Sequence, residues 1–437
     1  MKKILFALVA LAATADLAAQ TLTAHSEQPR YSIRPYASVE EAVAAAGGGS
    51  RYIVPLTEWR REEVDGKTRF TTEFVYPAAW LNRQILFRTE SASCGFGVEV
   101  EGSDAGSVTN GAVPAEFNIT KLAKTGINRI SVTLAPSSES EPLNRADVQW
   151  LGKAEIVSQP TVRVRDLDMR TTLNGSGDAI FEMAIAVKSE ALNTKQASIS
   201  YELCDTLNRI TAGHKDVTLS MRGEDTVRFA TVIPRDLMWS AGKPVLLTLT
   251  IRNRIEGRYA ENIAVPVGVR EVAYANDRLW VNGEPVALKA KRVAANISTE
   301  ELLQLKDKGF NAVTVEAGEA PLDLYAACDS TGVYVVAQVA VDTSNGGRSI
   351  KRGGNASNDP QLTDEYLSRT SAMFHTSKFH PSVVAFSLGG GVSNGINPYE
   401  SYLLLKGLDS SRPIIYEGAG TEWNNDSFDL QIVNPNR

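Results

Sequence analysis

The stretch NAVTVEAGEAPLDLYAACDSTGVYVVAQVAV, residues 311–341, decides the fold class of this chain. It has the pattern of an apolar strand over 311–317, a helix over 321–332 and a second apolar strand over 333–341. Strands that are apolar on both faces are typical of parallel sheets, in which helices cover the sheet. The stretch therefore predicts a β–α–β unit and an α/β domain built on a parallel sheet.

The same alternation extends through the C-terminal region, residues 268–437. It follows the hairpin RLWVNGEPVAL (278–288), whose Asn282-Gly283 pair is typical of a two-residue turn. A short strand, ALKA (287–290), and a helix over 299–309 come next. After the opening stretch, helices near 361–377 and 397–408 alternate with strands at 382–389, 413–418 and 428–435. We therefore expect about six strands in this sheet.

The preceding part of the chain has short strands separated by turn residues. GFGVEVEG (95–102) and NRISVTLA (128–135) alternate or run apolar, which predicts an antiparallel β-sandwich over residues 27–157. Strands such as AIFEMAIAVKS (179–189) recur over residues 158–267 at the spacing of a second, immunoglobulin-like sandwich. Neither region contains a catalytic motif.

The N-terminus, MKKILFALVALAATADLAAQ, has the pattern of a secretory signal. Lys2 and Lys3 precede a short apolar stretch, and small residues follow it. We expect residues 1–19 to be removed, leaving no transmembrane segment and a protein in the periplasm or at the outer surface. A net charge of −6 argues against a nucleic-acid partner.

The cysteines and histidines give no sign of a metal centre. Cys94, Cys204 and Cys328 lie far apart in apolar contexts, so we expect free thiols. No Cys/His cluster has the spacing of a zinc site, and we expect neither metal nor cofactor. His375 is expected to be exposed on its helix, and His380 to hydrogen-bond a backbone group.

Several local segments match one known family in order and spacing. They are FVYPAAW (74–80), PAEFNIT (114–120), LMWSAGKPVLLTLTI (237–251), VGVREVAYANDRLWVNGEPVALKA (267–290), LKDKGFNAVTVEA (305–317) and KFHPSVVAFSLG (378–389). Together they resemble glycoside hydrolase family 2, the group of β-galactosidases, β-glucuronidases and β-mannosidases. The resemblance implies a jelly-roll, sugar-binding-like domain over 27–157. It also implies part of a (β/α)₈ barrel over 268–437, with its site at the carboxyl ends of the strands.

The resemblance also implies where the catalytic acid should stand. In the family, the acid/base glutamate closes an S-L-G-N-E motif at the end of the fourth barrel strand. Ser387, Leu388 and Gly389 match this motif, but Gly390 stands at the Asn position and Gly391 at the Glu position. Glycine cannot protonate a leaving oxygen, as a retaining glycosidase requires. We therefore expect a degenerate family member.

The family's nucleophilic glutamate belongs to the seventh barrel strand. The sequence ends at Arg437, after a segment that matches the sixth strand, so we expect an incomplete, C-terminally truncated barrel of about six strands. Such a barrel would leave open sheet edges, which either the rest of the chain or a partner, an envelope protein, would have to cover. The loops that supply the family's metal ligands are not matched either, which implies no metal site.

Other residues near the expected strand ends are weaker candidates. Four carboxylates are possible substitutes for the missing catalytic pair: Glu316, Glu319, Asp342 and Glu417. Trp423 with Asn424 and Asn425 is the best candidate for sugar binding, because polar residues surround a single aromatic ring. Three other tryptophans are expected to belong to the core: Trp59, Trp80 and Trp150.

Three functions remain open from the sequence. The first is a non-catalytic envelope protein that docks a partner, and the second is a non-catalytic carbohydrate binder. The third is a residually active β-glycosidase that uses displaced carboxylates or a partner chain. Because the acid position is glycine, we expect an inactive pseudoenzyme that serves in assembly or in carbohydrate binding.

Overall fold

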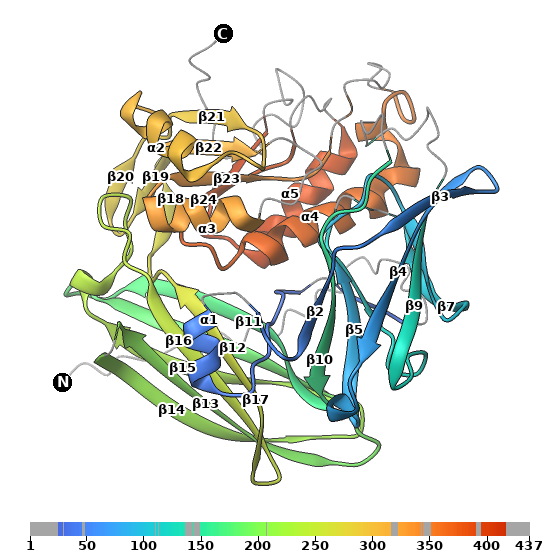
Figure 1. Ribbon diagram of the computed structural model, residues 1–437. Helices are drawn as coiled ribbons and strands as arrows, with labels where there is room; N and C mark the ends of the chain where they lie inside the picture. The colour runs from blue at the N-terminus through green and yellow to red at the C-terminus, as the bar shows by residue number, and fades with distance from the viewer. Residues whose placement is uncertain are drawn as a thin grey trace.

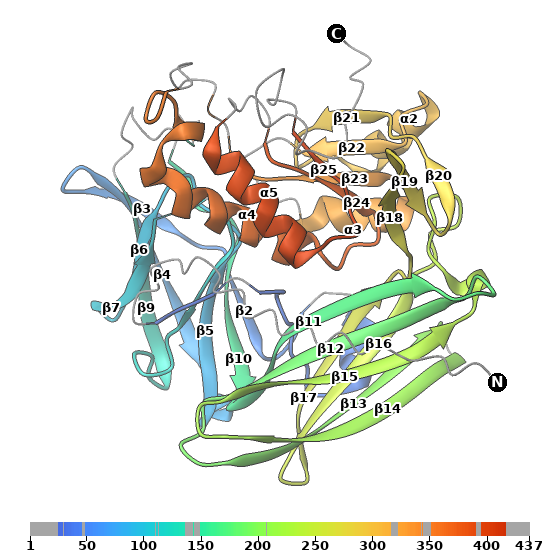
Figure 2. The ribbon, with the colours of Figure 1, turned by 180° about the vertical axis from the view of Figure 1, so that it is seen from behind.

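The computed structural model places three groups of sheets (Figures 1 and 2). In Figure 1 a parallel sheet and its helices occupy the upper part, one sandwich lies below them and another lies to the right. The described residues are 25–28, 30–45, 49–109, 111, 113–135, 143, 149–206, 208–315, 322–341, 343, 351–389 and 395–416.

The first sandwich consists of two antiparallel sheets of five strands each. One sheet has the order β1 (Ser26–Glu27), β8 (Ala115–Asn118), β5 (Arg83–Thr89), β10 (Ala154–Pro160), β2 (Ile53–Leu56). The other has the order β3 (Arg60–Val64), β4 (Lys67–Tyr76), β9 (Gly126–Leu134), β6 (Phe96–Val100), β7 (Ser103–Val108). Alternate residues of β9 are buried, and Phe87, Phe96 and Phe117 from both sheets share one core. The predicted antiparallel sandwich is confirmed.

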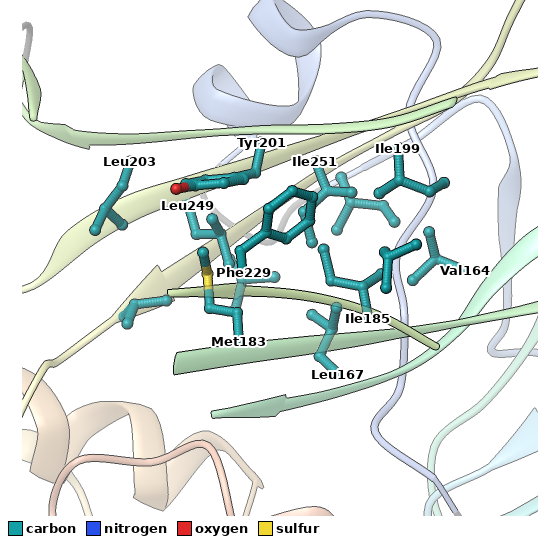
Figure 3. Packing of buried hydrophobic residues seen from close by; sticks show 14 of the residues in the cluster. Val164, Leu167, Met183, Ile185, Ile199, Tyr201, Leu203, Phe229, Leu249 and Ile251 are labelled. Carbon is teal, nitrogen blue, oxygen red and sulfur yellow. The ribbon is translucent and has the colours of Figure 1, made fainter. Parts of the chain in front are cut away.

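The second sandwich packs a three-stranded sheet against a four-stranded sheet. The strands of the first are β11 (Val162–Leu173), β12 (Ala179–Ser189) and β15 (Glu224–Ile233), and those of the second are β14 (Asn208–Leu219), β13 (Lys195–Asp205), β16 (Leu247–Ile255) and β17 (Arg258–Val267). Figure 3 shows Met183 and Ile185 on one side of this core and Tyr201 on the other. The alternating sequence of β12 predicts this arrangement, because every second side chain points inward.

Short helical segments accompany the two sandwiches. Helix α1 (Val39–Ala45) contacts β16 and β17. Two 3₁₀ turns, η1 (Ala78–Trp80) and η2 (Arg235–Leu237), follow β4 and β15. No helix within the described residues has both the length and the apolar character needed to span a bilayer.

A small antiparallel sheet leads into the parallel one. It contains β18 (Val272–Ala275), β19 (Arg278–Val281) and β20 (Glu284–Val286). Asn282 and Gly283 both have positive φ angles, 53° and 77°, as the predicted tight turn between β19 and β20 requires.

The parallel sheet has its described strands in sequence order. They are β21 (Ala290–Val293), β22 (Ala312–Val315), β23 (Tyr334–Gln338), β24 (Val383–Ser387) and β25 (Ile414–Ile415). Between them lie α2 (Thr299–Asp307), α3 (Leu322–Thr331), η3 (Ala356–Asn358), η4 (Pro360–Leu362), α4 (Thr363–Ser377) and α5 (Ile396–Leu408). The prediction of a parallel α/β sheet is confirmed, whereas the strand expected at 428–435 lies outside the described residues.

Helix α4 joins the parallel sheet to the second sandwich. Lys378, directly after α4, forms an ion pair of 2.9 Å with Asp166 of β11. The expectation that His375 is exposed is wrong, since only 6% of this residue is accessible. Its ring lies 4.0 Å from Asp166, in an interface between segments about 200 residues apart that leaves no local sequence pattern.

This buried histidine predicts sensitivity to acid. Burial first, and then the nearby Lys378 ammonium, lower the pKa of His375 from 6.5 to about 3. The unfolded chain therefore takes up a proton on His375 below about pH 6.5, whereas the folded protein does so only near pH 3. The contribution of neutral His375 to the folding free energy is therefore complete above about pH 6.5 and is lost as the pH falls from 6.5 towards 3.

The variant His375→Leu tests this pH dependence. Leucine cannot be protonated, so the variant is expected to lose stability less steeply on acidification, by up to about 1.4 kcal/mol per pH unit. The measurement is denaturant unfolding at a series of pH values between 7 and 4. Equal slopes for the variant and the parent protein would contradict the prediction.

Candidate functional site

The carboxyl ends of the parallel strands lie along one edge of the sheet. Ser387, at the end of β24, is in register with Gln338 of β23 and Ile415 of β25. The backbone N–H of Val339 donates to the Ser387 carbonyl at 2.9 Å, and that of Leu388 donates to the Ile415 carbonyl at 3.1 Å. The apolar strands thus bring three distant segments to one place, where α/β proteins commonly bind ligands.

The three residues that match the family motif have structural roles at this edge. Leu388 is buried in the core that the parallel strands share with their helices, and Ser387 is buried at the strand end. Gly389 has a φ of 131°, which disfavours residues with a side chain, and its N–H donates to Ser387 Oγ at 3.4 Å. These residues therefore direct the chain at the end of β24 whether or not a catalytic group follows.

The principal sequence candidates lie outside the described residues. These are the two glycines at the expected acid/base motif, the four substitute carboxylates and the proposed sugar-binding group: Gly390, Gly391, Glu316, Glu319, Asp342, Glu417, Trp423, Asn424 and Asn425. Trp80 is buried in the first sandwich and Trp59 packs partly buried against the same core, as predicted. Trp150 is half-buried.

The described part of the edge carries neutral polar groups. Thr314, Gln338, Ser387 and Tyr416 are all buried there, and none of the described residues that end or directly follow the five strands is a carboxylate. Gln338 Nε2 has no hydrogen-bond partner among the described residues. Burial raises the pKa of the Tyr416 hydroxyl further above its ordinary value, which already lies well above neutral pH. Such groups can hydrogen-bond a polar ligand, but they are poor proton donors to a leaving group.

An arginine missed by sequence reasoning supports this edge. Arg369 of α4 is only 1% exposed, and its Nη1 donates to the carbonyls of Leu143 at 2.9 Å and Ala340 at 2.6 Å. Its Nε donates to the Glu365 carboxylate at 3.2 Å. Leu143 lies between β9 and β10 of the first sandwich. The Arg369 side chain therefore connects this segment, through the Leu143 carbonyl, to the parallel sheet. The i,i+4 spacing of Glu365 and Arg369 was the available sequence signal.

A histidine–carboxylate pair lies at the opposite, amino edge of the sheet. His380 precedes β24, and its Nδ1 is 2.6 Å from Asp329 Oδ2, so the expected backbone partner is replaced by a carboxylate. Asp329 Oδ1 also accepts hydrogen bonds from the backbone N–H and the hydroxyl of Ser382. The serine bonds the carboxylate rather than the histidine, which differs from a nucleophilic triad. The cluster fixes the start of β24.

Potential metal ligands are dispersed in the part of the chain that the structure describes. No three His, Cys, Asp or Glu side chains gather there in a group able to hold an ion. The three cysteines are free thiols, as predicted, with Cys94 and Cys328 buried and Cys204 half-buried.

Taken together, these features define a multidomain β-sandwich and α/β protein with a polar edge at its parallel strands. Residues 162–270 match the family described as "Glycosyl hydrolases family 2", and residues 282–435 match "Glycosyl hydrolases family 2, TIM barrel domain". The chain belongs to glycoside hydrolase family 2.

Named relatives are longer than this chain. A β-galactosidase of Pseudoalteromonas haloplanktis is 26% identical over 374 residues, 80% of this chain and 35% of the relative. A β-galactosidase of Yersinia pestis is 26% identical over 402 residues, 85% of this chain and 38% of the relative. The chain thus spans little more than a third of these relatives.

Solved structures share the fold at low sequence identity. A β-D-glucuronidase of Dictyoglomus thermophilum superposes with a TM-score of 0.67 at 16% identity, covering 84% of this chain and 73% of that one. A β-glucuronidase of Bacteroides uniformis gives 0.68 at 15% identity, covering 90% of this chain and 52% of that one.

Proposed function

We propose that this chain is an exported family 2 protein that binds carbohydrate without hydrolysing it. The observation that carries the proposal is the Gly390-Gly391 pair, which follows the matched Ser387-Leu388-Gly389 at the carboxyl end of β24. A retaining glycosidase needs an acid/base carboxyl group there, and glycine has none. The described residues at the strand ends provide no carboxylate in its place.

The proposed ligands are β-linked galactosides or glucuronides, because the relatives are named β-galactosidases and β-glucuronidases. Gln338 and Ser387 offer amide and hydroxyl groups near the strand ends, and Trp423 with its neighbouring asparagines is the proposed platform for a sugar ring. We also infer that the first sandwich is a jelly roll and that the parallel sheet is part of a (β/α)₈ barrel. The pattern of residues 1–19 supports export.

The absence of hydrolysis is tested with activated substrates. The 2,4-dinitrophenyl β-galactoside, β-glucuronide and β-mannoside have leaving groups that need no acid, so they report on a nucleophile even where the acid is missing. We expect no dinitrophenolate above the spontaneous rate and no glycosyl adduct by mass spectrometry. Turnover that disappears in Glu316→Gln or Glu417→Gln would overturn the proposal.

Binding is tested by calorimetry with methyl β-galactoside and methyl β-glucuronide. Trp423→Ala is expected to weaken the affinity for the neutral methyl β-galactoside about tenfold, as the loss of one aromatic contact of about 1.4 kcal/mol would. Trp280→Ala, on the hairpin at the amino edge, is the matched control and should bind like the parent. No binding of either glycoside, with one envelope protein co-purifying in stoichiometric amount, would replace carbohydrate binding by protein assembly.

A further inference from the structure

A polar cavity lies outside the parallel sheet, where the two sandwiches meet. It is lined by β1, by β5, β8 and the turn after β8, and by β11, β12 and two turns of the second sandwich. Its volume is about 670 Å³, within the range of roughly 300–1,000 Å³ that small-molecule sites occupy. We call this space the junction cavity.

The floor of the junction cavity is a network of buried ion pairs. Arg165, 7% exposed, lines the cavity and lies 3.6 Å from Glu27 and 3.7 Å from Glu116. The connected network has four cations and three carboxylates: Arg88, Arg163, Arg165, Lys188, Glu27, Glu116 and Glu190. One positive charge is therefore left without a carboxylate in the network.

The surrounding cations lower the pKa values of two carboxylates of the network, Glu116 and Glu27. Burial acts to raise the pKa of Glu116, but the guanidinium groups of Arg88 and Arg165 outweigh it and hold that pKa at about 2. The pKa of Glu27 is also lowered, against the effect of burial, by Arg163, Arg165 and Lys188. The network therefore remains cationic across the physiological pH range.

The mouth of the cavity adds to the positive charge. Lys121 and Arg222 are exposed there, and the lining as a whole has five lysines and arginines against three glutamates. A buried excess charge is unfavourable unless a counter-charge approaches it. The junction cavity is therefore suited to an anionic group.

One wall of the cavity offers neutral hydrogen-bonding groups. Asn118 Nδ2 donates to Gln84 Oε1 at 3.1 Å, and Thr120 Oγ1 donates to Asn118 Oδ1 at 2.6 Å. These bonds orient Gln84 with its oxygen occupied, and no described residue accepts a hydrogen bond from its Nε2. Amide and hydroxyl groups in a fixed chain are suited to sugar hydroxyls.

The rim opposite this wall is partly apolar. Leu192 is 71% exposed and lines the cavity, and Met221 is 60% exposed in the neighbouring turn. The backbone N–H of Arg222 donates to the Ala191 carbonyl at 3.1 Å, which ties the two turns together. The rim thus places apolar side chains beside a cation, as a sugar ring with one charged substituent requires.

We propose that the junction cavity binds an acidic saccharide, a sugar residue that carries a carboxylate or a sulfate. Arg165, Lys121 and Arg222 would hold the anionic group. Gln84 and Asn118 would bond the hydroxyls, and Leu192 would cover an apolar ring face. This site does not depend on the strand-end site, because no residue is shared between them.

The test is calorimetry on the full chain at low and high salt with methyl β-D-glucuronide, galactose 6-sulfate, methyl β-D-galactoside and sodium sulfate. We expect the glucuronide or the sulfated sugar to bind at least about tenfold more tightly than the neutral galactoside, and more weakly in high salt. Whichever acidic sugar binds more tightly identifies the anionic group.

Variants locate the binding. Gln84→Glu is nearly isosteric and places a negative charge in a cationic cavity, so it should remain folded and lose binding at least about tenfold. Arg222→Gln should weaken binding similarly, whereas Arg209→Gln, exposed on β14 of the same sandwich, is the matched control and should not. Trp423→Ala should leave this binding unchanged, which separates it from the proposed strand-end site.

Three outcomes would overturn the proposal. In the first, acidic and neutral sugars bind equally or not at all. In the second, sodium sulfate binds as tightly as the acidic sugars, which indicates an anion site only. In the third, affinity for the acidic sugar survives in Gln84→Glu while the variant unfolds at the same temperature as the parent.

Discussion

Replacing Glu27 by glutamine is expected to destabilise the attachment of β1 by about 3–5 kcal/mol, the usual effect of removing one member of a buried ion pair. Glu27 lies 3.1 Å from Arg163, 3.6 Å from Arg165 and 2.9 Å from Lys188. Arg163 is fully buried, so without Glu27 its charge has fewer compensating groups and no access to water. Because β1 is only two residues long, few other interactions hold it against β8.

Because the network has more cations than carboxylates, removing a cation should destabilise the protein less than removing a carboxylate. Lys188→Gln removes a positive charge from the same network, leaves three cations with three carboxylates, and acts at a side chain that is partly exposed. Its expected effect is about 1 kcal/mol or less. Native-state hydrogen exchange of the β1 and β8 amides gives the free energy of local opening in both variants. A local measurement is needed, since a multidomain chain need not unfold in a single step. Equal destabilisation by the two substitutions would show that the network carries no excess positive charge.

The sheets of this protein could be predicted from the sequence because each strand has a local pattern. The apolar strands β22 and β23 and the helix between them predict a parallel unit, and the alternation in β12 predicts a sandwich strand. The turn at Asn282-Gly283 follows from the positive φ angles that these two residues tolerate. Local chemistry was sufficient for these elements.

The contacts between domains left no comparable signal. His375 is buried because β11 lies against α4, and Arg369 is buried because Leu143 reaches it from the first sandwich. Each contact joins residues more than 200 positions apart, so no periodicity within either segment predicts it. The junction cavity depends on the same kind of contact. At the strand ends, the sequence alone shows that Gly391 stands where the family motif has glutamate, whereas the neutral groups of Gln338 and Tyr416 emerged only from the fold.

Substitution of Trp239 by alanine is expected to cost about 3–5 kcal/mol of folding free energy, the range for large aromatic side chains in cores. Trp239 lies after the last strand of the three-stranded sheet in the second sandwich, and it is 0% exposed. Its ring makes an edge contact with Tyr334 at the start of β23, with centroids 5.9 Å apart. The same cluster contains Leu279 of the hairpin and Val384 of β24. The indole therefore packs where the second sandwich, the hairpin and the amino ends of the parallel strands meet.

The polar atoms of Trp239 strengthen this junction. Its indole Nε1 donates to the Asp329 carbonyl at 2.8 Å, and its own carbonyl accepts from Asn282 Nδ2 at 2.8 Å. Trp239→Phe keeps most of the ring volume and removes only the indole hydrogen bond, so it should cost about 1–2 kcal/mol. Denaturant unfolding monitored by circular dichroism compares the two variants. If phenylalanine were as damaging as alanine, the hydrogen bond to Asp329 rather than the packed ring would hold the second sandwich to the parallel sheet.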